Sequence, residues 1–440
     1  MRVYLDTVGC RLNQGEIETY ARQFRSAGHV LVSSPEEADL VVVNTCAVTT
    51  QAASDSRQKI RQAHRAGVEQ IIATGCWTTL DPQDATALPG VTRVVPNAQK
   101  DRLVADLLGV PMEAFDLEPV ERQPIPGARL RTRAFLKVQD GCDNRCTFCV
   151  TTIARGDGRS RPVEAVLSDV CAAVAGGSQE VVLAGVHLGS WGQDFTQPLH
   201  LRHLVQTILE ETDAPRLRLS SLEPWDLDES FFALWQDPRL CRHLHLPLQS
   251  GCAATLKRMA RKTTPKSFAD LVAAARAAIP DVAITTDIIV GFPGETEAEF
   301  MKSLDFVQRM LFAAGHVFTY SSRPGTVAAR MKPHIPHPIR KARNAQMRQA
   351  FARSADAYRM RFVNATLPVL WESAKVIAPN GWELSGLTDN YLRVVAHAPQ
   401  ELWNQITLVR MIGVLPDGLT GEISIGNDEV QPVRNPLGVA

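Results

Sequence analysis

Three cysteines gather in one short segment of the 440-residue chain, GCDNRCTFC at residues 141–149. Cys142, Cys146 and Cys149 have the spacing C-x3-C-x2-C, which can fold one loop around one metal centre. A structural zinc site needs four protein ligands, and neither a fourth cysteine nor a histidine lies nearby in the sequence. An iron–sulfur cube held by three thiolates instead leaves one iron open. The missing fourth ligand favours a 4Fe-4S cluster, with structural zinc as the alternative.

An open iron at the mouth of a β/α barrel can chelate the amino and carboxylate groups of S-adenosylmethionine and support its reductive cleavage to a carbon radical. Polar residues at or soon after predicted β/α elements are candidate cofactor contacts, with barrel-lining structure as the alternative; they are Arg159, Glu223, Gln249 and Asp287. Gly185 and Gly291 would act through their backbone, because a Cβ at a strand end would crowd a ligand. No catalytic residue is assigned beyond the cluster ligands.

A second trio of cysteines is spread along the first part of the chain. Cys10, Cys46 and Cys76 each fall just after a predicted parallel strand. The carboxyl ends of parallel strands lie on one edge of a sheet, where ligands bind, so the three thiols could converge. The alternative is three separate buried cysteines that pack as small apolar residues. The remaining cysteines, Cys171, Cys241 and Cys252, are assigned to packing or incidental exposure.

The elements that must position these thiols alternate between strand and helix, which predicts an α/β fold. Residues 1–125 form a parallel α/β sheet domain, with strands at 2–7, 39–44, 70–74 and 91–95. Residues 126–363 contain about six further β/α units, which predicts a partial (β/α)6 barrel with its working face at the strand ends. The predicted strands of this barrel are 135–138, 180–186, 216–221, 243–247, 283–290 and 316–320.

Residues 364–440 change to short strand-like runs separated by turns, which predicts a small β-barrel. Its predicted strands are 367–372, 382–384, 391–395, 408–414 and 422–425. Tyr391 and Arg393 would place an aromatic ring and a cation on one face of a strand, a combination suited to unpaired RNA bases and phosphate. A strand edge packed against the larger barrel is the alternative.

The charge of the chain is balanced, with 47 Lys and Arg against 47 Asp and Glu, so any nucleic-acid surface must be local. A basic stretch at 330–361, which includes Arg343 and Arg348, is such a place, although a solvated helical face would look the same. The 45% hydrophobic content excludes a disordered chain, a collagen and a coiled-coil rod. Neither a signal segment nor a transmembrane stretch is apparent, which predicts a cytoplasmic protein without a membrane partner.

The cysteine loop and several other stretches together resemble the radical S-adenosylmethionine methylthiotransferases over nearly the whole chain. These stretches are VGC at 8–10, NTC at 44–46, TGC at 74–76, RG at 155–156, RSR at 159–161, AGVHLG at 184–189, LPLQSG at 246–251 and DIIVGFPGET at 287–296. The resemblance implies that Cys142, Cys146 and Cys149 hold one 4Fe-4S cluster, with Phe148 against the cofactor. It also implies that Cys10, Cys46 and Cys76 hold a second one. Trp77 and Thr78 depart from the tyrosine and small residues expected there.

The resemblance further implies how two clusters are used. Sulfur at the second cluster is methylated by one S-adenosylmethionine, and a second S-adenosylmethionine yields the 5′-deoxyadenosyl radical that removes hydrogen from the substrate carbon. The carbon radical then captures the methylthio group. Sulfur and substrate must meet, so we expect the loops of Cys46 and Cys146 to face one cavity.

The tail GLTDNYLRV at 386–394 with GEI at 421–423 resembles the TRAM domain of RNA-modifying enzymes. QSG at 249–251 resembles the tRNA branch of the family, and His187 with SRPGT at 322–326 resembles enzymes acting at C2 of N6-threonylcarbamoyladenosine 37, in the anticodon stem-loop. The alternatives are N6-isopentenyladenosine, a ribosomal-protein aspartate, and an iron–sulfur RNA-binding module without turnover. An electron donor such as flavodoxin or ferredoxin is expected, and the sulfur donor is left open.

Overall fold

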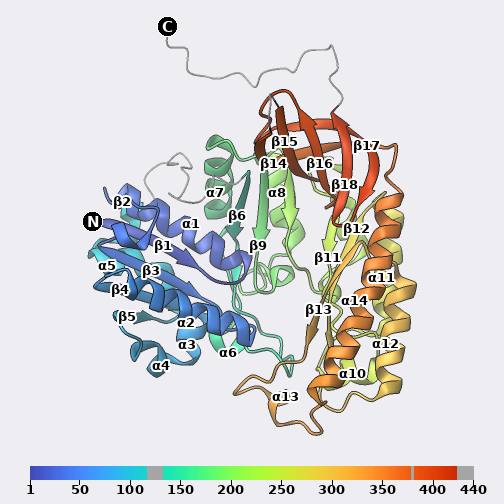
Figure 1. Ribbon diagram of the computed structural model, residues 1–440, viewed down its shortest axis with the longest axis horizontal. Coiled ribbons are helices and arrows are strands. Elements are labelled where there is room, and N and C mark those ends of the chain that lie inside the picture. The colour runs from blue at the N-terminus through green and yellow to red at the C-terminus, as the bar shows by residue number, and fades with distance from the viewer. Residues whose placement is uncertain (116–131, 378–380, 424–440) are drawn as a thin grey trace. The chain divides into compact units, whose positions relative to one another are not determined.

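The computed structural model describes residues 1–115, 132–377 and 381–423. It divides the chain into two compact units, of which the first holds residues 1–358 with 389–391, and the second holds the rest. The α/β fold class predicted from the sequence is confirmed, with a parallel N-terminal sheet and a closed C-terminal β-barrel. Figure 1 labels the elements.

The first unit begins with a five-stranded parallel sheet in the order β2-β1-β3-β4-β5. Its strands are β1 (Arg2–Thr7), β2 (Val30–Leu31), β3 (Leu40–Thr45), β4 (Gln70–Gly75) and β5 (Val91–Val95). Every residue of β3 is buried, as expected for a central parallel strand with both faces covered. The four strands predicted for this part were found with nearly the same bounds, and the two-residue β2 was missed.

Helices cover both faces of this sheet (Figure 1). Phe24 of α1 (Arg11–Ser26) and Val104 of α5 (Leu103–Leu108) pack with Val42 on one face. Ile60 of α2 (Thr50–Arg65) and Trp77 of α3 (Cys76–Leu80) pack on the other, with α4 (Pro82–Thr86) alongside. Short 3-10 turns lie at Pro35–Glu37, Lys100–Arg102 and Met112–Phe115. Cys76 begins α3 directly after β4, and Cys10 is the N-cap residue of α1, three residues after the end of β1.

Six further parallel strands follow in sequence order, as predicted for a partial barrel. They are β6 (Arg133–Lys137), β9 (Glu180–Ala184), β10 (Leu217–Leu219), β11 (His243–His245), β12 (Ala283–Val290) and β13 (Ala314–Thr319). They form two three-stranded sheets, β10-β9-β6 and β11-β12-β13, which isolated parallel bridges such as Leu217–Leu240 connect. A two-stranded ribbon of β7 (Gln139–Asp140) and β8 (Arg159–Ser160) brackets the Cys142 loop.

The helices of this part pack around the strands. They are α6 (Thr151–Arg155), α7 (Val163–Ala175), α8 (Leu201–Glu211), α9 (Glu229–Phe232), α10 (Ala253–Arg258), α11 (Pro265–Ala278), α12 (Glu297–Met310), α13 (Val327–Arg330) and α14 (His337–Met360). Thr264 and Thr296 each form a capping box at the start of α11 and α12. Three more 3-10 turns occupy Leu188–Ser190, Pro224–Asp226 and Ala233–Gln236.

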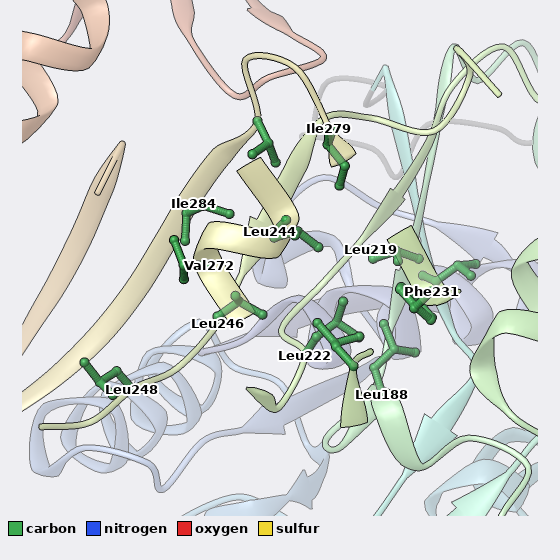
Figure 2. Close-up of a cluster of buried hydrophobic side chains, with 14 of the residues drawn as sticks. Leu188, Leu219, Leu222, Phe231, Leu244, Leu246, Leu248, Val272, Ile279 and Ile284 are labelled. Atoms are coloured by element: carbon green, nitrogen blue, oxygen red, sulfur yellow. The ribbon is translucent and has the colours of Figure 1, made fainter. Parts of the chain in front are cut away.

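One apolar core holds this part together. Figure 2 shows a portion of it, in which Leu244 and Ile284 lie near Val272 of α11 and Leu219 lies farther along the same core. All four are at most 1% exposed, and burying such a side chain stabilises the fold by roughly 1.5–3 kcal/mol. The strand ends, and the loops that follow them, are therefore held on a rigid base.

The second unit contains a closed barrel of five strands in the order β14-β15-β16-β18-β17. The strands are β14 (Thr366–Ile377), β15 (Gly381–Thr388), β16 (Arg393–Ala398), β17 (Ile406–Leu415) and β18 (Gly418–Ile423). The β16–β18 pair is parallel and the other pairs are antiparallel. Each of the five strands predicted here has a counterpart, although residues 424–425 of the last prediction lie outside the described residues. The domain boundary predicted between residues 125 and 126 also lies outside the described residues.

Candidate functional site

Cys10, Cys46 and Cys76 lie at the carboxyl ends of three adjacent strands. The register pairs Thr7 with Asn44 and Thr45 with Gly75, so β1, β3 and β4 end level with one another. A Cβ placed on Gly9 would lie 2.6 Å from the Cys46 Sγ, which shows how closely the Cys46 side chain packs beside the Cys10 loop. The three cysteines therefore stand at one edge of the sheet, and their convergence on one cluster stays a prediction.

Two glycines make this approach possible. Gly9 and Gly75, each directly before a cysteine of the trio, have φ angles of 103° and 101°. A Cβ on Gly75 would lie 2.3 Å from the carbonyl oxygen of Thr45. Both positions therefore require glycine for backbone conformation and for space.

Asparagine side chains tie the loops of the trio together. Asn13 Nδ2 donates to the carbonyl oxygens of Val8 (2.8 Å) and Thr45 (3.1 Å), and Asn13 Oδ1 lies 3.8 Å from the Cys10 Sγ. Asn97 Nδ2 lies 3.6 Å from the Cys76 Sγ and donates to the carbonyl oxygen of Ala154 at 2.7 Å. Because Ala154 belongs to α6, the Cys76 site is attached directly to the helix that follows Cys149.

The trio of Cys142, Cys146 and Cys149 occupies the loop between β7 and α6. Gly141, with φ of 72°, allows the loop to turn where a Cβ would lie 1.8 Å from the Asp157 carbonyl oxygen. Cys142 N donates to the Gly156 carbonyl oxygen at 3.0 Å, and Cys149 N donates to the Cys146 carbonyl oxygen at 3.1 Å. All three thiols are partly exposed. The loop is therefore fixed by its backbone, and its three cysteines are neither fully buried nor fully exposed.

Neither cysteine trio is grouped tightly enough to hold a single metal ion. Within the described residues, no three His, Cys, Asp or Glu side chains are grouped so that they could hold one metal ion. A cube distributes its thiolate ligands over different irons, and so needs a wider trio of cysteines. Burial raises the pKa of Cys46 to about 11 and also raises the pKa of Cys10 and Cys146. Ligation therefore has to displace protons from these thiols.

Arg261, which sequence reasoning missed, lies beside Cys146. Its guanidinium is 3.7 Å from the Cys146 Sγ and forms a bidentate ion pair with Glu223 at 3.1 and 2.6 Å. It also lies 4.5 Å from the ring centroid of Trp225. The candidate Glu223 is thus near the cysteine loop, linked to it by Arg261. Nothing local in the sequence distinguishes Arg261 from a surface cation.

His187 lies on the other side of the same loop. Its Nε2 is 2.6 Å from Asp226 Oδ2, and its Nδ1 is 3.2 Å from Asn144 Nδ2. Burial lowers the pKa of His187, but hydrogen bonds to Asp226 and Cys142 outweigh this and raise the pKa to about 10. In the sequence, His187 served only to distinguish branches of a family.

The remaining cofactor candidates occupy different surroundings. Phe148 packs edge-on against Phe292, with ring centroids 6.4 Å apart. Asp287 lies 3.4 Å from His245 and 3.2 Å from His316, and although burial raises its pKa, these two contacts lower it overall. Gln249 has a φ of 73° and exchanges backbone hydrogen bonds with β12. Their contact with a cofactor stays a prediction.

Three other candidates have local structural explanations. A Cβ on Gly185 would lie 3.0 Å from Gln139 Oε1, and one on Gly291 would lie 2.3 Å from Arg340 Cγ. These glycines therefore make room for side chains of the chain itself. Arg159 is exposed, and its guanidinium donates to the carbonyl oxygens of Arg155 and Asp157, both at 3.2 Å.

Two predictions about RNA-binding residues are wrong in their structural premise. Arg343 is 5% exposed and pairs with Glu295 (2.8 Å) and Glu297 (2.9 Å), so it is not a surface cation. Tyr391 precedes β16, has a φ of 66°, and stacks on His243 with ring centroids 4.1 Å apart. It therefore does not share a strand face with Arg393. Arg348 and Arg393 are exposed, as an RNA contact requires.

A cleft of about 370 Å³ lies where the N-terminal part meets the end of β13. Thr50 of α2 lines it together with Tyr320, Ser321 and Arg340. Thr50 Oγ1 and Ser321 Oγ are 3.1 Å apart. The N-terminal sheet domain therefore borders the partial barrel at the edge that carries Cys46.

Comparisons with known proteins agree with this arrangement. Residues 2–96 match the family described as Uncharacterized protein family UPF0004, and residues 136–307 match the Radical SAM superfamily. The threonylcarbamoyladenosine tRNA methylthiotransferase MtaB of Bacillus subtilis is 35% identical over 93% of each chain. The chain belongs to the radical S-adenosylmethionine methylthiotransferases.

Other relatives of this methylthiotransferase family span nearly all of the chain as well. MtaB of Thermotoga maritima is 36% identical over 89% of this chain and 90% of its own. The tRNA-2-methylthio-N(6)-dimethylallyladenosine synthase of Aliarcobacter butzleri is 30% identical over 96% of this chain and 98% of its own. The radical S-adenosylmethionine methyltransferase TsrM of Kitasatospora setae has a similar fold, with a TM-score of 0.57 at 16% identity over 74% of this chain and 75% of its own.

Family membership makes the protein an enzyme that uses S-adenosylmethionine and a 4Fe-4S cluster. When bound, this pair supplies a carbon-centred radical. Among the described residues, no helix has both the length and the apolar character needed to cross a bilayer.

Proposed function

We propose that the enzyme inserts a methylthio group at C2 of N6-threonylcarbamoyladenosine 37, beside the anticodon of tRNA. The relatives from B. subtilis and T. maritima are named threonylcarbamoyladenosine tRNA methylthiotransferases. Both are more similar to this chain than the tRNA-2-methylthio-N(6)-dimethylallyladenosine synthase of A. butzleri. N6-isopentenyladenosine and a ribosomal-protein aspartate are the alternative substrates.

The observation that carries the proposal is the attachment of one cysteine trio to the other. Asn97 contacts the Cys76 thiol and the Ala154 carbonyl oxygen, and Ala154 lies in α6 directly after the Cys142–Cys149 loop. A reaction that joins sulfur to a substrate radical needs both sites within reach of one substrate. We infer that Cys10, Cys46 and Cys76 hold a second 4Fe-4S cluster, and that the loops of Cys46 and Cys146 face one cavity.

The division of labour follows from this assignment. Residues 1–125 would provide the sulfur site, residues 126–363 would bind S-adenosylmethionine and the first cluster, and residues 364–440 would form a TRAM-like RNA-binding barrel. Phe148, Glu223, Gln249, Asp287, Arg159, Gly185 and Gly291 are the candidate cofactor contacts. We further infer that the enzyme works in the cytoplasm with an electron donor such as flavodoxin or ferredoxin, and that it recognises the anticodon stem-loop.

Mass spectrometry of digested tRNA from cells with and without the gene tests this function. The deletion should remove 2-methylthio-N6-threonylcarbamoyladenosine and leave N6-threonylcarbamoyladenosine in its place. Plasmid-borne wild-type protein should restore the product. Loss of 2-methylthio-N6-isopentenyladenosine instead would establish the first alternative, and an unchanged set of nucleosides would contradict tRNA modification.

The exposed cations of α14 are our candidates for phosphate contacts. Lys341, Arg348 and Arg353 are exposed and lie on a helix whose other face is buried by Met347 and Phe351. Affinity for nucleic acid falls as salt rises, so the slope of log affinity against log salt concentration is negative. Each cation that neutralises a phosphate makes this slope steeper by about 0.7–0.9. Arg393 of β16, in the second unit, is exposed as well and is a separate candidate.

Arg348→Gln is therefore expected to weaken tRNA binding several-fold. It should also make the negative slope of log affinity against log salt concentration shallower by about 0.7–0.9. Filter binding of tRNA between low and moderate salt measures both quantities. Arg343→Gln is the matched control, because this arginine belongs to the same helix but is buried in ion pairs. It should lower the melting temperature while the salt slope stays unchanged. An unchanged slope for Arg348→Gln would remove this arginine from the RNA surface.

A further inference from the structure

A buried set of charges joins the N-terminal sheet domain to the partial barrel. Glu16 of α1, 3% exposed, lies 2.6 Å from Lys100 Nζ, 3.5 Å from Lys137 Nζ and 3.2 Å from Arg155 Nη1. Asp140 of β7, 4% exposed, lies 2.8 Å from Arg155 Nη1 and 3.4 Å from Lys137 Nζ. Such charges are costly to bury, so their arrangement calls for an explanation.

Arg155 is the member of this set that reaches both cysteine trios. Its Nη2 donates to Asn13 Oδ1 at 2.8 Å, and Asn13 holds the backbone of Val8 and Thr45 beside Cys10 and Cys46. Its Nη1 donates to Asp140 Oδ1, which also accepts the Gly141 N–H at 2.9 Å, one residue before Cys142. Arg155 itself ends α6, the helix that follows Cys149.

The planar guanidinium suits this task because it presents several donors in a fixed fork. Lysine would keep the charge but could not hold Asn13, Glu16 and Asp140 in one geometry. Arginine also stays protonated at every relevant pH. Arg155 is 3% exposed and holds Asn13, whose Oδ1 lies 3.8 Å from the Cys10 Sγ, so its charge lies close to the Cys10 site.

We propose that Arg155 is a positioning residue of methylthio transfer, which keeps the Cys10 loop in register with the Cys142–Cys149 loop and supplies a fixed positive charge to the site of Cys10, Cys46 and Cys76. The inference rests on the proposed function, because it takes Cys10, Cys46 and Cys76 to be the ligands of a cluster. A nearby positive charge favours the more negative, reduced form of an iron–sulfur cluster and so raises its reduction potential.

The test first isolates the second site. In a full-length background with Cys142→Ala, Cys146→Ala and Cys149→Ala, anaerobic reconstitution should load only the trio of the sheet domain. Iron content and an EPR-monitored redox titration are then compared for Arg155, Arg155→Lys and Arg155→Met. Arg155→Met should shift the midpoint potential to more negative values, and Arg155→Lys should keep it near that of the parent protein. Equal potentials in all three proteins, at equal iron content, would overturn the electrostatic role.

Arg22→Gln is the control for docking alone. Arg22 lies on the same helix as Asn13 and pairs with Asp169 of α7 at 3.1 Å, so it crosses the same boundary away from the thiols. A shift in Arg22→Gln equal to that in Arg155→Met would overturn the proposal. If Arg155→Met retains no iron, Arg155→Lys decides: retention of iron at the parent potential supports the role of the charge, and loss of iron in both variants overturns it.

The alignment of the Cys10 loop with the Cys142–Cys149 loop is tested in the protein that keeps all six cysteines of the two trios. The readout is 5′-deoxyadenosine formed per methylthio group inserted. Arg155→Lys should raise this ratio several-fold, because radical formation continues while the sulfur site is misplaced, and Arg22→Gln should not. An unchanged ratio in Arg155→Lys would overturn the positioning role. Wild-type protein that makes no methylthio-tRNA, combined with the expected potential shift, would contradict the proposed function and leave the electrostatic role of Arg155 standing.

Discussion

Replacing Cys10, Cys46 and Cys76 together by alanine is expected to abolish methylthio insertion into tRNA while 5′-deoxyadenosine formation continues. The Cys142–Cys149 loop is held by its own backbone hydrogen bonds and by Gly141, none of which involves the sheet-domain thiols. Alanine removes one sulfur atom at each position and leaves the glycines that shape the loops. Cleavage of S-adenosylmethionine should therefore survive, and the sulfur source should be lost.

Iron analysis separates this outcome from a damaged fold. Two cubes correspond to about eight irons per chain and one cube to about four. The variant lacking Cys10, Cys46 and Cys76 should hold about half of the wild-type iron, and so should a variant lacking Cys142, Cys146 and Cys149. Only the latter should lose 5′-deoxyadenosine formation. Cys171→Ala, which removes an exposed thiol of α7 outside both trios, should keep all the iron and full activity.

A variant without the sheet-domain thiols that keeps about four irons but produces no 5′-deoxyadenosine would contradict the assignment of radical formation to the Cys142 loop. Methylthio product from that same variant would contradict the assignment of the sulfur site. Both measurements use one preparation, so neither result can be blamed on a difference in reconstitution.

The sequence predicted the strands and the cysteine loop well, because short local patterns of residues indicate them. The short apolar run of β3 favoured a buried strand, and two further predicted parallel strands placed Cys10 and Cys76 at the same edge. The spacing of Cys142, Cys146 and Cys149 was readable because a single loop supplies all three thiols. The division into alternating strands and helices followed from the same periodicities.

The predictions that Arg343 and Tyr391 bind RNA were wrong because they used the type of each residue and not its position on the helix or strand. Arg343 stands four residues before Met347, and Met347 stands four before Phe351, so a buried helix face passes through the arginine. That stripe was visible in the sequence. Tyr391 follows Asp389 and Asn390 in a turn, and its positive φ ends any strand pairing before Arg393.

The buried charges had no local signal at all. Arg155 is more than a hundred residues away in the sequence from its partners Asn13 and Glu16, and Lys137 is equally far from Glu16. Residues of these types are mostly exposed in proteins, so their burial could not be expected from the sequence. Arg261 beside Cys146 is a similar case, since its neighbour Glu223 belongs to another β/α unit. Only the tertiary fold brings these partners together.

Glu16→Gln is expected to destabilise the protein by about 3–5 kcal/mol at neutral pH, because it leaves buried cations without their shared carboxylate. Lys100 is completely buried and has its Nζ 2.6 Å from Glu16 Oε1. Glu16 Oε2 also accepts a hydrogen bond from Asn44 at 2.9 Å. Denaturant unfolding of the metal-free protein, followed by circular dichroism, measures the loss. Glu36→Gln, which changes an exposed carboxylate of the same domain, should leave the unfolding midpoint unchanged.

The pH dependence of this loss provides an independent check. Burial raises the pKa of Glu16, but Lys100, Arg155 and Lys137 outweigh it and lower the pKa from 4.5 to about 2. A carboxylate with a lowered pKa in the folded state stabilises the fold above its unfolded pKa, and this contribution disappears as the pH falls through the folded value. At about 1.4 kcal/mol per pKa unit it amounts to roughly 3 kcal/mol. The difference between wild type and Glu16→Gln should therefore be constant above pH 5 and shrink below about 4.5; a difference that stayed constant down to pH 3 would mean that the lost packing, and not the charge, is responsible.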